Sequence, residues 1–549
     1  MKVWNGEHTA DIPVGATAAQ ALSALGLLGA DTLAAMSGGL SVDLSAPLPC
    51  GGKIAPVTLA DEEGRRVYER SLRFVLLLAL RRRMPGQRVR IEHSVHGGVL
   101  IRLPGRTVTG EDLDGLREEM RGITAARLPF TQEVWPRERA IDYFAADGQE
   151  DKAALLRTRP YDWFRVYRCG EMAEYFYGVM APDTGSVAVF DLAAVDSDGF
   201  ALLLPTKGAV DTPQTYLSRP KHMAVFAQSS RWCGILGVTN VADLTALQCR
   251  GGLREFIRVN EVLHDLAMGE IAERIVEENR RVVLVAGPSS SGKTTFAGRM
   301  AVQLRVKGCR GWRLSLDDYY LDRDAIPREP DGTLDLEHLR TLDLDRFQAD
   351  VNRLLCGEEA EIPRFSFVTG KREPEGHPLR LGEGEVLIVE GIHALNPELS
   401  AAIPPDAVHR IFVSDLTCLN LDDHNRIRTT DVRLLRRIVR DHRCRGTTPE
   451  ETLAMWPSVR QGEERWIFPF QERADSVFNT ALHYELPVLR HFAYDLLEAV
   501  PPEAEGYLAA RRLMKLLHYI PDIDERILDE IPPLSLLREF IGGCTIDEV

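Results

Sequence analysis

Long apolar runs and paired cysteines are both missing from this 549-residue chain. Its longest apolar run, Phe74 to Leu80, is far too short to span a bilayer, and its N-terminus carries acids where a signal peptide has an apolar core. The nine cysteines form no C-x-x-C pair, which argues against a zinc site and a disulfide framework. We therefore expect a cytoplasmic protein with reduced thiols and no membrane partner.

The sequence also lacks an excess of basic residues, tandem repeats and low-complexity segments. Its formal net charge of −15 argues against broad, nonspecific nucleic-acid binding, although a local basic surface is compatible with it. With 44% hydrophobic and 27% charged residues, the composition is that of an ordinary globular protein. The length exceeds that of a single core, so we expect three or four domains.

Changes in pattern divide the chain into five predicted segments. An Asn5-Gly6 turn between short strands opens a β-rich unit. Strands mixed with amphipathic helices follow, and then a helical stretch. From Arg280 onward strands alternate with helices, which predicts a mostly parallel sheet covered by helices on both faces. The segments are 1–60 (β-rich), 61–214 (α+β), 215–279 (helical linker), 280–485 (parallel α/β) and 486–549 (helical, with a polar tail).

A glycine-framed loop stands between a predicted strand and a predicted helix. It fits the pattern G-x-x-x-x-G-K-[ST], in which backbone N–H groups and a helix N-terminus face the phosphates of a nucleotide. Lys293 is expected to reach the β- and γ-phosphates, and the Thr294 hydroxyl to ligate Mg²⁺. The predicted nucleotide-binding residues here are Gly287, Ser289, Ser290, Ser291, Gly292, Lys293, Thr294 and Thr295.

Acidic residues follow the next two strands of this region. Asp317 and Asp318 come directly after one apolar strand, and Glu390 ends another. Ligands of open α/β sheets gather beyond the carboxyl ends of the strands. One of the two aspartates is expected to hold Mg²⁺ or to accept the proton of an attacking hydroxyl, the alternative being acids that cap a turn. Glu390 is expected on the metal side rather than as an ordinary exposed charge.

Eight arginines lie between residues 426 and 445, partly at helical spacing. Such a run is often a solvated helix face. Next to a triphosphate it would instead form a mobile lid whose guanidinium groups stabilise charge on the transferring phosphoryl group. We favour the lid.

These motifs resemble, in the same order, those of the uridine kinase branch of the phosphoribulokinase/uridine kinase family, from about Val282 to Asn479. The stretches are "GPSSSGKTT", "SLDDYY", "LDLEHL", "IVEGIHAL" and "DVRLLRRIVRD". The resemblance implies ATP and Mg²⁺ as cofactors and a P-loop kinase fold. It further implies Asp317, Lys293 and Arg437 as catalytic, Arg440 towards ATP, Thr294 and Glu390 on the metal, and Asp317, Tyr320, Glu337, Phe365, Phe367 and Arg433 on the acceptor.

The base pocket departs from the family's pattern. Where the family has roughly Y-D-F-V-T-H, this chain has "FSFVTG", so Phe365 and Gly370 replace the Tyr and His that recognise a pyrimidine. Phe365 and Phe367 can still stack on a flat ring. The hydrogen bonds by which the Tyr and His distinguish one base from another are lost. The resemblance thus implies phosphorylation of a nucleoside 5′-hydroxyl with open base specificity. A sugar phosphate or another alcohol is the alternative acceptor.

The N-terminal region to about Leu204 resembles threonyl-tRNA synthetase: a TGS domain and then the domain that edits mischarged tRNA. The family's editing residues, H-x-x-x-H and C-x-x-x-H, are replaced by Arg70, Phe74, Phe176 and Met180. None of these supplies an imidazole or thiolate, so we expect no editing. Scaffold, RNA contact, ligand binding and subunit contact, including a homo-oligomer, remain open for this half.

A third hypothesis belongs to another class of protein. TGS domains also occur in regulatory nucleotide-binding proteins. On this hypothesis the chain is an RNA- or ribosome-associated regulator that uses nucleotide binding as a switch. The guanine-reading motif N-K-x-D is missing, and the acceptor residues Asp317, Glu337 and Arg433 would be idle. The kinase is therefore preferred. The predicted fold class is multidomain α/β: a small β-rich TGS-like domain, an α+β domain and a P-loop kinase domain.

Overall fold

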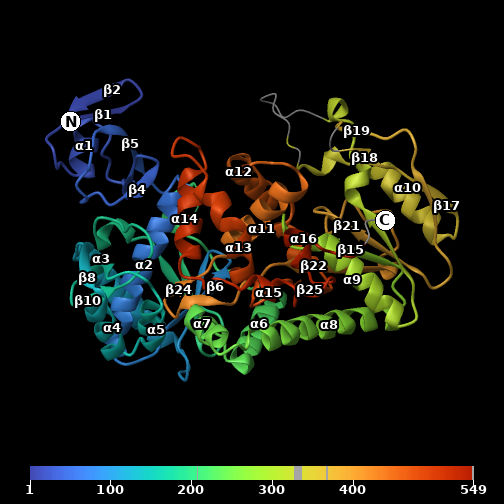
Figure 1. The fold of residues 1–549 in the computed structure, drawn as a ribbon, viewed down its shortest axis with the longest axis horizontal. Helices are drawn as coiled ribbons and strands as arrows, with labels where there is room; N and C mark the ends of the chain where they lie inside the picture. The colour runs from blue at the N-terminus through green and yellow to red at the C-terminus, as the bar shows by residue number, and fades with distance from the viewer. Residues whose placement is uncertain (207, 327–334, 336, 367–368, 547–549) are drawn as a thin grey trace.

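The computed structural model describes residues 1–546 except 207, 327–334, 336 and 367–368. Figure 1 shows the N-terminal half at one end of the molecule and a parallel sheet at the other, with C-terminal helices between them. No helix in the described part of the chain is long and apolar enough to cross a membrane.

The sheet of the C-terminal half has five parallel strands in the order β16-β21-β15-β22-β25. The first four were predicted from their apolar runs, which fits strands buried on both faces. The fifth, β25, was missed because it is short and follows a long helical stretch. The strands are β15 (Val282–Ala286), β16 (Gly311–Ser315), β21 (Val386–Glu390), β22 (Val408–Ser414) and β25 (Ser476–Asn479).

Helices cover both faces of this sheet, as the alternating pattern predicted. On one face α8 (Leu253–Glu277) and α9 (Lys293–Val306) pack Met268 and Phe296 against the strands. On the other face α10 (Leu344–Leu355) contributes Phe347. The predicted linker therefore includes α8, a helix that covers the sheet. Preceding it are α6 (Pro220–Leu236) and α7 (Val241–Cys249).

The first unit is a small mixed sheet in the order β2-β1-β5-β3-β4, packed on one helix, α1 (Ala18–Ala24). The predicted hairpin is present: β1 pairs antiparallel with β2, and Gly6 supplies the positive φ of +58° that the turn requires. Its strands are β1 (Lys2–Asn5), β2 (His8–Asp11), β3 (Ala34–Ser37), β4 (Leu40–Val42) and β5 (Gly52–Val57).

The second unit is built around α2 (Glu62–Arg83), a helix that begins with acids and ends with arginines, as its dipole favours. The predicted α+β pattern is present as two antiparallel sheets. One contains β6 (Arg90–Val95), β7 (Gly98–Arg102), β11 (Asp191–Ala194) and β12 (Gly199–Leu203); the other contains β8 (Thr131–Pro136), β9 (Trp163–Cys169) and β10 (Met172–Glu174). The remaining helices are α3 (Gly110–Ala125), α4 (Arg137–Ala146) and α5 (Glu150–Arg157).

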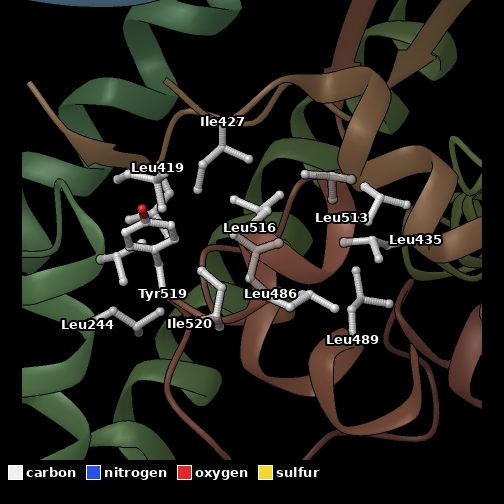
Figure 2. Packing of buried hydrophobic residues seen from close by; sticks show 14 of the residues in the cluster. Leu244, Leu419, Ile427, Leu435, Leu486, Leu489, Leu513, Leu516, Tyr519 and Ile520 are labelled. Carbon is white, nitrogen blue, oxygen red and sulfur yellow. The ribbon is translucent and has the colours of Figure 1, made fainter. Parts of the chain in front are cut away.

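The C-terminal segment is helical, and its last helix packs back onto the molecule. Leu536, Leu537 and Phe540 are therefore buried. Figure 2 shows part of the core in which the C-terminal helices pack, and residues of the N-terminal half such as Phe144 belong to the same cluster. The helices are α11 (Thr429–Cys444), α12 (Pro449–Trp466), α13 (Glu485–Glu498), α14 (Tyr507–Leu517), α15 (Glu525–Leu528) and α16 (Arg538–Ile541).

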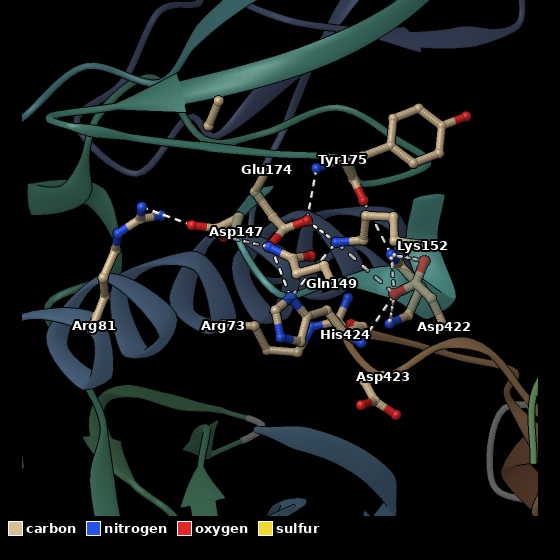
Figure 3. A network of polar contacts seen from close by, with 12 residues as sticks. Arg73, Arg81, Asp147, Gln149, Lys152, Glu174, Tyr175, Asp422, Asp423 and His424 are labelled. Atoms are coloured by element: carbon tan, nitrogen blue, oxygen red, sulfur yellow. Dashed lines mark hydrogen bonds and ion pairs between the residues drawn. The ribbon is translucent and has the colours of Figure 1, made fainter. Parts of the chain in front are cut away.

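A buried polar network also joins the two halves. The hairpin of β23 (Asn420–Asp422) and β24 (Asn425–Arg426) carries Asp422 and His424 to the N-terminal half (Figure 3). There Lys152 forms an ion pair with Glu174, and His424 Nδ1 lies 2.8 Å from Glu174 Oε2. Desolvation lowers the pKa of Lys152, and the Asp422 carboxylate 3.9 Å away acts against that shift. Removing one member would leave buried charge without a partner.

We predict that Lys152→Met lowers the free energy of unfolding by about 3–5 kcal/mol, because it leaves the buried carboxylate of Glu174 without its lysine cation. Chemical denaturation measures this. The control is Lys307→Met, which removes an exposed pair with Glu273 at 3.3 Å and should cost less than about 1 kcal/mol. Equal costs for the two variants would show that the network does not stabilise the junction.

Candidate active site

The glycine-framed loop between β15 and α9 has the backbone geometry of a phosphate-binding loop. A Cβ at Gly287 would collide with the carbonyl oxygen of Val413, and Gly292 has a φ of +85°. Ser290, a residue that prefers negative φ, is held at +58°. Strain of this kind persists only where the surrounding structure imposes it, and it concentrates at ligand-binding turns.

The loop presents polar groups of the kind that bind a phosphate. The hydroxyl oxygens of Ser290 and Ser291 are buried, and neither has a hydrogen-bond partner among the described residues. The loop opens directly into α9, so first-turn N–H groups and the positive end of the helix dipole face the same space. The residues predicted to hold the nucleotide thus have the donors and orphaned hydroxyls that a phosphate would satisfy.

Lys293 stands where the loop meets the acidic residues. Its Nζ donates to the carbonyl oxygen of Pro288 at 3.2 Å, which keeps the ammonium at the loop. Desolvation lowers the pKa of Lys293, while Glu390, Glu539 and Asp317 act in the opposite direction. The lysine is therefore surrounded by carboxylates rather than exposed as a surface charge.

The sheet register brings the predicted acids together. In adjacent parallel strands Ser315 pairs with Glu390, and Glu390 pairs with Val285 just before the loop. Thr294 Oγ1 and Ser315 Oγ donate to Glu390 Oε1 at 3.4 and 3.1 Å, and the N–H of Asp317 donates to Ser315 Oγ at 3.3 Å. Desolvation, then repulsion from Asp317, raises the pKa of Glu390 to about 7.

This acidic pair has the donor chemistry for magnesium. Among the described residues no three His, Cys, Asp or Glu side chains form a complete metal cage. Magnesium is commonly held by one or two carboxylates together with phosphate oxygens and waters, and does not require such a cage. Thr294, Glu390 and Asp317 supply that partial set beside the loop. Asp317 is accessible to solvent, and desolvation by the surrounding protein raises its pKa.

The arginine-rich helix α11 is packed into the core and does not stand apart as a lid. Arg437 Nη1 donates to Ser289 Oγ at 2.7 Å, which places this predicted catalytic arginine on the loop. Arg440 pairs with Asp441 at 3.1 Å. Arg433, predicted on the acceptor, is instead buried in an ion pair with Glu463 and donates to the carbonyl oxygen of Ser289 at 3.0 Å. It therefore supports the loop from behind.

Three predicted acceptor residues, Tyr320, Glu337 and Phe365, lie near the carboxylates of the site. The rings of Tyr320 and Phe365 lie 5.6 Å apart, and desolvation followed by the charges of Asp317 and Glu337 raises the pKa of Tyr320 well above its usual value. Desolvation also raises the pKa of Glu337, and the positive charge of Arg437 acts against this shift. Phe367 lies outside the described residues.

The hairpin that carries Phe365 is β18 (Phe365–Ser366) with β19 (Lys371–Arg372). At its turn Gly370 has a φ of +67°, and the side chain of Arg323 occupies the space that a Cβ there would enter. The family's imidazole position is thus covered by an arginine from another segment.

One part of the chain matches a known protein family. Residues 282–485 match the phosphoribulokinase/uridine kinase family. For this similarity alone we refer to these residues as the kinase domain. Solved structures that resemble the chain include a candidate fructose transport system kinase from Silicibacter sp. TM1040, 20% identical with a TM-score of 0.30, covering 38% of this chain and 98% of that one. A candidate uridine kinase from Bacillus stearothermophilus is 17% identical with a TM-score of 0.25, covering 36% and 89%.

The N-terminal half is similar to part of another kind of protein. A threonine–tRNA ligase of Nitratidesulfovibrio vulgaris is 31% identical over 162 residues, which are 29% of this chain and 25% of that ligase. The chain thus spans about a quarter of the length of this relative. At the positions discussed above, Phe74, Phe176 and Met180 lie in the apolar core, and Arg70 and Phe176 line a cavity.

Two carboxylates at the phosphate loop were not predicted. Glu463 of α12 accepts from the N–H of Ser289 at 3.0 Å, and Glu539 of α16 accepts from the N–H of Thr295 at 3.2 Å. Each occupies a backbone donor that would otherwise face a phosphate. No local motif marks either residue, because both reach the loop from helices far along the chain.

We predict that Glu390→Gln makes the protein more stable at pH 8 but has little effect at about pH 4. With a pKa of about 7, Glu390 is protonated in the folded protein at pH 5.5, whereas an unfolded glutamate is ionised above about 4.3. The folded state therefore binds more protons, and this group costs stability as pH rises from about 4.3 to about 7.

Thermal or chemical unfolding without metal measures this difference. Glutamine stays neutral, so the gain should grow with pH and reach at most about 3–4 kcal/mol at pH 8, because the change in pKa from about 4.3 to about 7 is worth about 1.4 kcal/mol per pH unit. The control is Glu383→Gln at an exposed site. A Glu390→Gln effect that does not change with pH would contradict the raised pKa.

Proposed function

We propose that this protein is an ATP-dependent phosphotransferase that moves the γ-phosphate to a hydroxyl of a small acceptor, most favourably the 5′-hydroxyl of a nucleoside. One observation carries the proposal: the phosphate loop, Lys293 and the carboxylates of Asp317 and Glu390 converge at one edge of a parallel sheet. The family match of residues 282–485 supports the same reaction class.

In the proposed reaction, the acceptor hydroxyl attacks the γ-phosphorus while the bond to the β–γ bridging oxygen breaks, and ADP leaves. Asp317 orients the hydroxyl and accepts its proton as the new bond forms. Lys293 and Arg437 place positive charge along the phosphates. Magnesium, held at Thr294 and Glu390, would neutralise charge on the β- and γ-oxygens. Positioning and charge stabilisation dominate, because the transition state of phosphoryl transfer is loose.

A flat acceptor is supported by the aromatic pair Tyr320 and Phe365, and Glu337 is suited to accept hydrogen bonds from sugar hydroxyls. The second candidate is a sugar phosphate or another alcohol, and the sugar phosphate is supported by Arg323, whose side chain lies against Gly370. Incubation with ATP, Mg²⁺ and pooled nucleosides, then pooled sugar phosphates, distinguishes the two by mass spectrometry. No phosphorylated product from either pool would contradict the proposed activity.

Asp317→Asn should lower kcat by about 10²–10⁴-fold with ATP affinity largely kept, because an amide orients a hydroxyl but does not take its proton. Coupled-assay kinetics and a nucleotide titration measure both quantities. The matched control is Asp318→Asn. Asp318 Oδ1 accepts from the N–H of Phe365 at 3.4 Å, so its loss should raise KM for the acceptor more than it lowers kcat. If Asp318→Asn alone abolished turnover, the role given to Asp317 would be wrong.

Glu539→Gln should lower Kd for ATP by about ten-fold, because it removes a negative charge from the first turn of α9, where the phosphates are expected. Calorimetric titration of ATP with Mg²⁺ measures this. Glu530→Gln is the control, since Glu530 pairs with Arg258 away from the loop. Weaker ATP binding by Glu539→Gln would mean that the carboxylate serves the nucleotide rather than competing with it.

A further inference from the structure

A second site lies far from the phosphate loop, between the N-terminal half and α14. It is a cavity of about 520 Å³, and none of its lining residues belongs to the kinase domain. The walls come from α2, β9, the loop after β10, and α14. This volume is within the range of sites for small molecules. We call it the cationic pocket.

The pocket is positively charged in a protein of negative net charge. Five of its cations have no carboxylate within ion-pair distance among the described residues, and a single carboxylate, that of Glu63, lines the cavity. Arg512 also lines it but is paired with Asp431 at 2.9 Å. The five cations are Arg70, Arg159, Arg165, Arg511 and Lys515.

Arg159 gives the clearest indication of a ligand. Its side chain is only 8% exposed, and its Nε and Nη1 are buried without a hydrogen-bond partner in the described chain. Its Cζ lies 3.9 Å from the ring centroid of Tyr519 and 4.7 Å from that of Tyr161. The aromatic faces fix the guanidinium plane but offer no acceptor to its N–H groups. A buried charged donor without an acceptor is costly unless something else supplies one.

Lys515 shows that the positive charge is not neutralised within the protein. It lies on α14 one turn after Arg511 and opens to the pocket. Desolvation, followed by repulsion from Arg70 and Arg159, lowers its pKa to about 8. An anion bound among these side chains would remove that repulsion.

The pocket also offers aromatic surface. Trp163 is 52% exposed and Tyr161 is 37% exposed, and both line the cavity. Large aromatic side chains are normally buried for most of their area, so two at one cationic site indicate a surface for stacking. Proteins bind nucleotides by pairing arginine and lysine side chains with the phosphate and by stacking aromatic rings on the base. This pocket offers both kinds of side chain.

We propose that the cationic pocket binds a nucleoside monophosphate, with its phosphate on Arg159 and Lys515 and its base stacked on Trp163 or Tyr161. The net charge of −15 repels a long polyanion, and the cavity volume suits one nucleotide. A single-stranded RNA shares this chemistry and is therefore the competing occupant in the test. The pocket is separate from the phosphate loop, so the proposal does not depend on the kinase activity.

The test is calorimetric titration of the full chain with UMP and AMP, alongside inorganic phosphate, uridine and an octauridylate. The monophosphates should bind more tightly than phosphate or uridine alone, because only they use both parts of the pocket. Lys293→Ala, at the phosphate loop, should leave this binding within about two-fold of the unaltered chain. If binding is lost in Lys293→Ala, the nucleotide occupies the kinase site and the proposal fails.

Arg159→Met and Lys515→Met should each weaken binding of UMP by about ten-fold, the loss expected for a charge-assisted contact. Lys515 is exposed, so its substitution keeps the test valid if the Arg159 variant folds poorly. The matched control is Arg157→Met: Arg157 is exposed, pairs with Glu150 and does not line the pocket. Unchanged affinity in Lys515→Met, or octauridylate binding more than ten-fold tighter than UMP, would overturn the assignment.

Discussion

The candidate active site depends on the electrostatic balance between one lysine and three carboxylates. Glu390, Glu539 and Asp317 each favour the charged form of Lys293, while desolvation disfavours it. The carboxylates also repel one another, and repulsion from Asp317 contributes to the pKa of about 7 at Glu390. Arg440 lies 4.0 Å from Glu539, and Arg445 and Arg440 act against the raised pKa of Asp317. The repulsion between Asp317 and Glu390 persists beside these cations, and a bound divalent cation would relieve it.

Long-range packing holds this balance in place. Arg433 and Glu463, buried together, connect α11 and α12 to the phosphate loop, and α16 brings Glu539 to the first turn of α9. The core that fixes α11, α13 and α14 also contains residues of the N-terminal half, such as Phe144 and Tyr175. The N-terminal half is therefore part of the structure that supports the kinase domain, in addition to carrying the cationic pocket.

The sequence was sufficient for features that rest on local chemistry. Apolar runs predicted four of the five strands, the Asn5-Gly6 turn predicted a hairpin, and the spacing of Gly287, Gly292 and Lys293 predicted the loop. The sequence did not predict contacts between segments that lie far apart along the chain. Glu463 and Glu539 reach the loop across 174 and 244 residues, and helical spacing gave no sign that Arg433 pairs with a glutamate rather than an acceptor.

The most direct test of this electrostatic account is the titration of Glu390 itself, followed by ¹³C NMR of side-chain-labelled glutamate and assigned with Glu390→Gln. Without ligand, the carboxyl should titrate near pH 7. With Mg²⁺ and a non-hydrolysable ATP analogue, it should stay ionised down to about pH 5, because a bound cation favours the charged form. Titration near pH 4.3 in the free protein, or the same curve with and without ligand, would contradict the account.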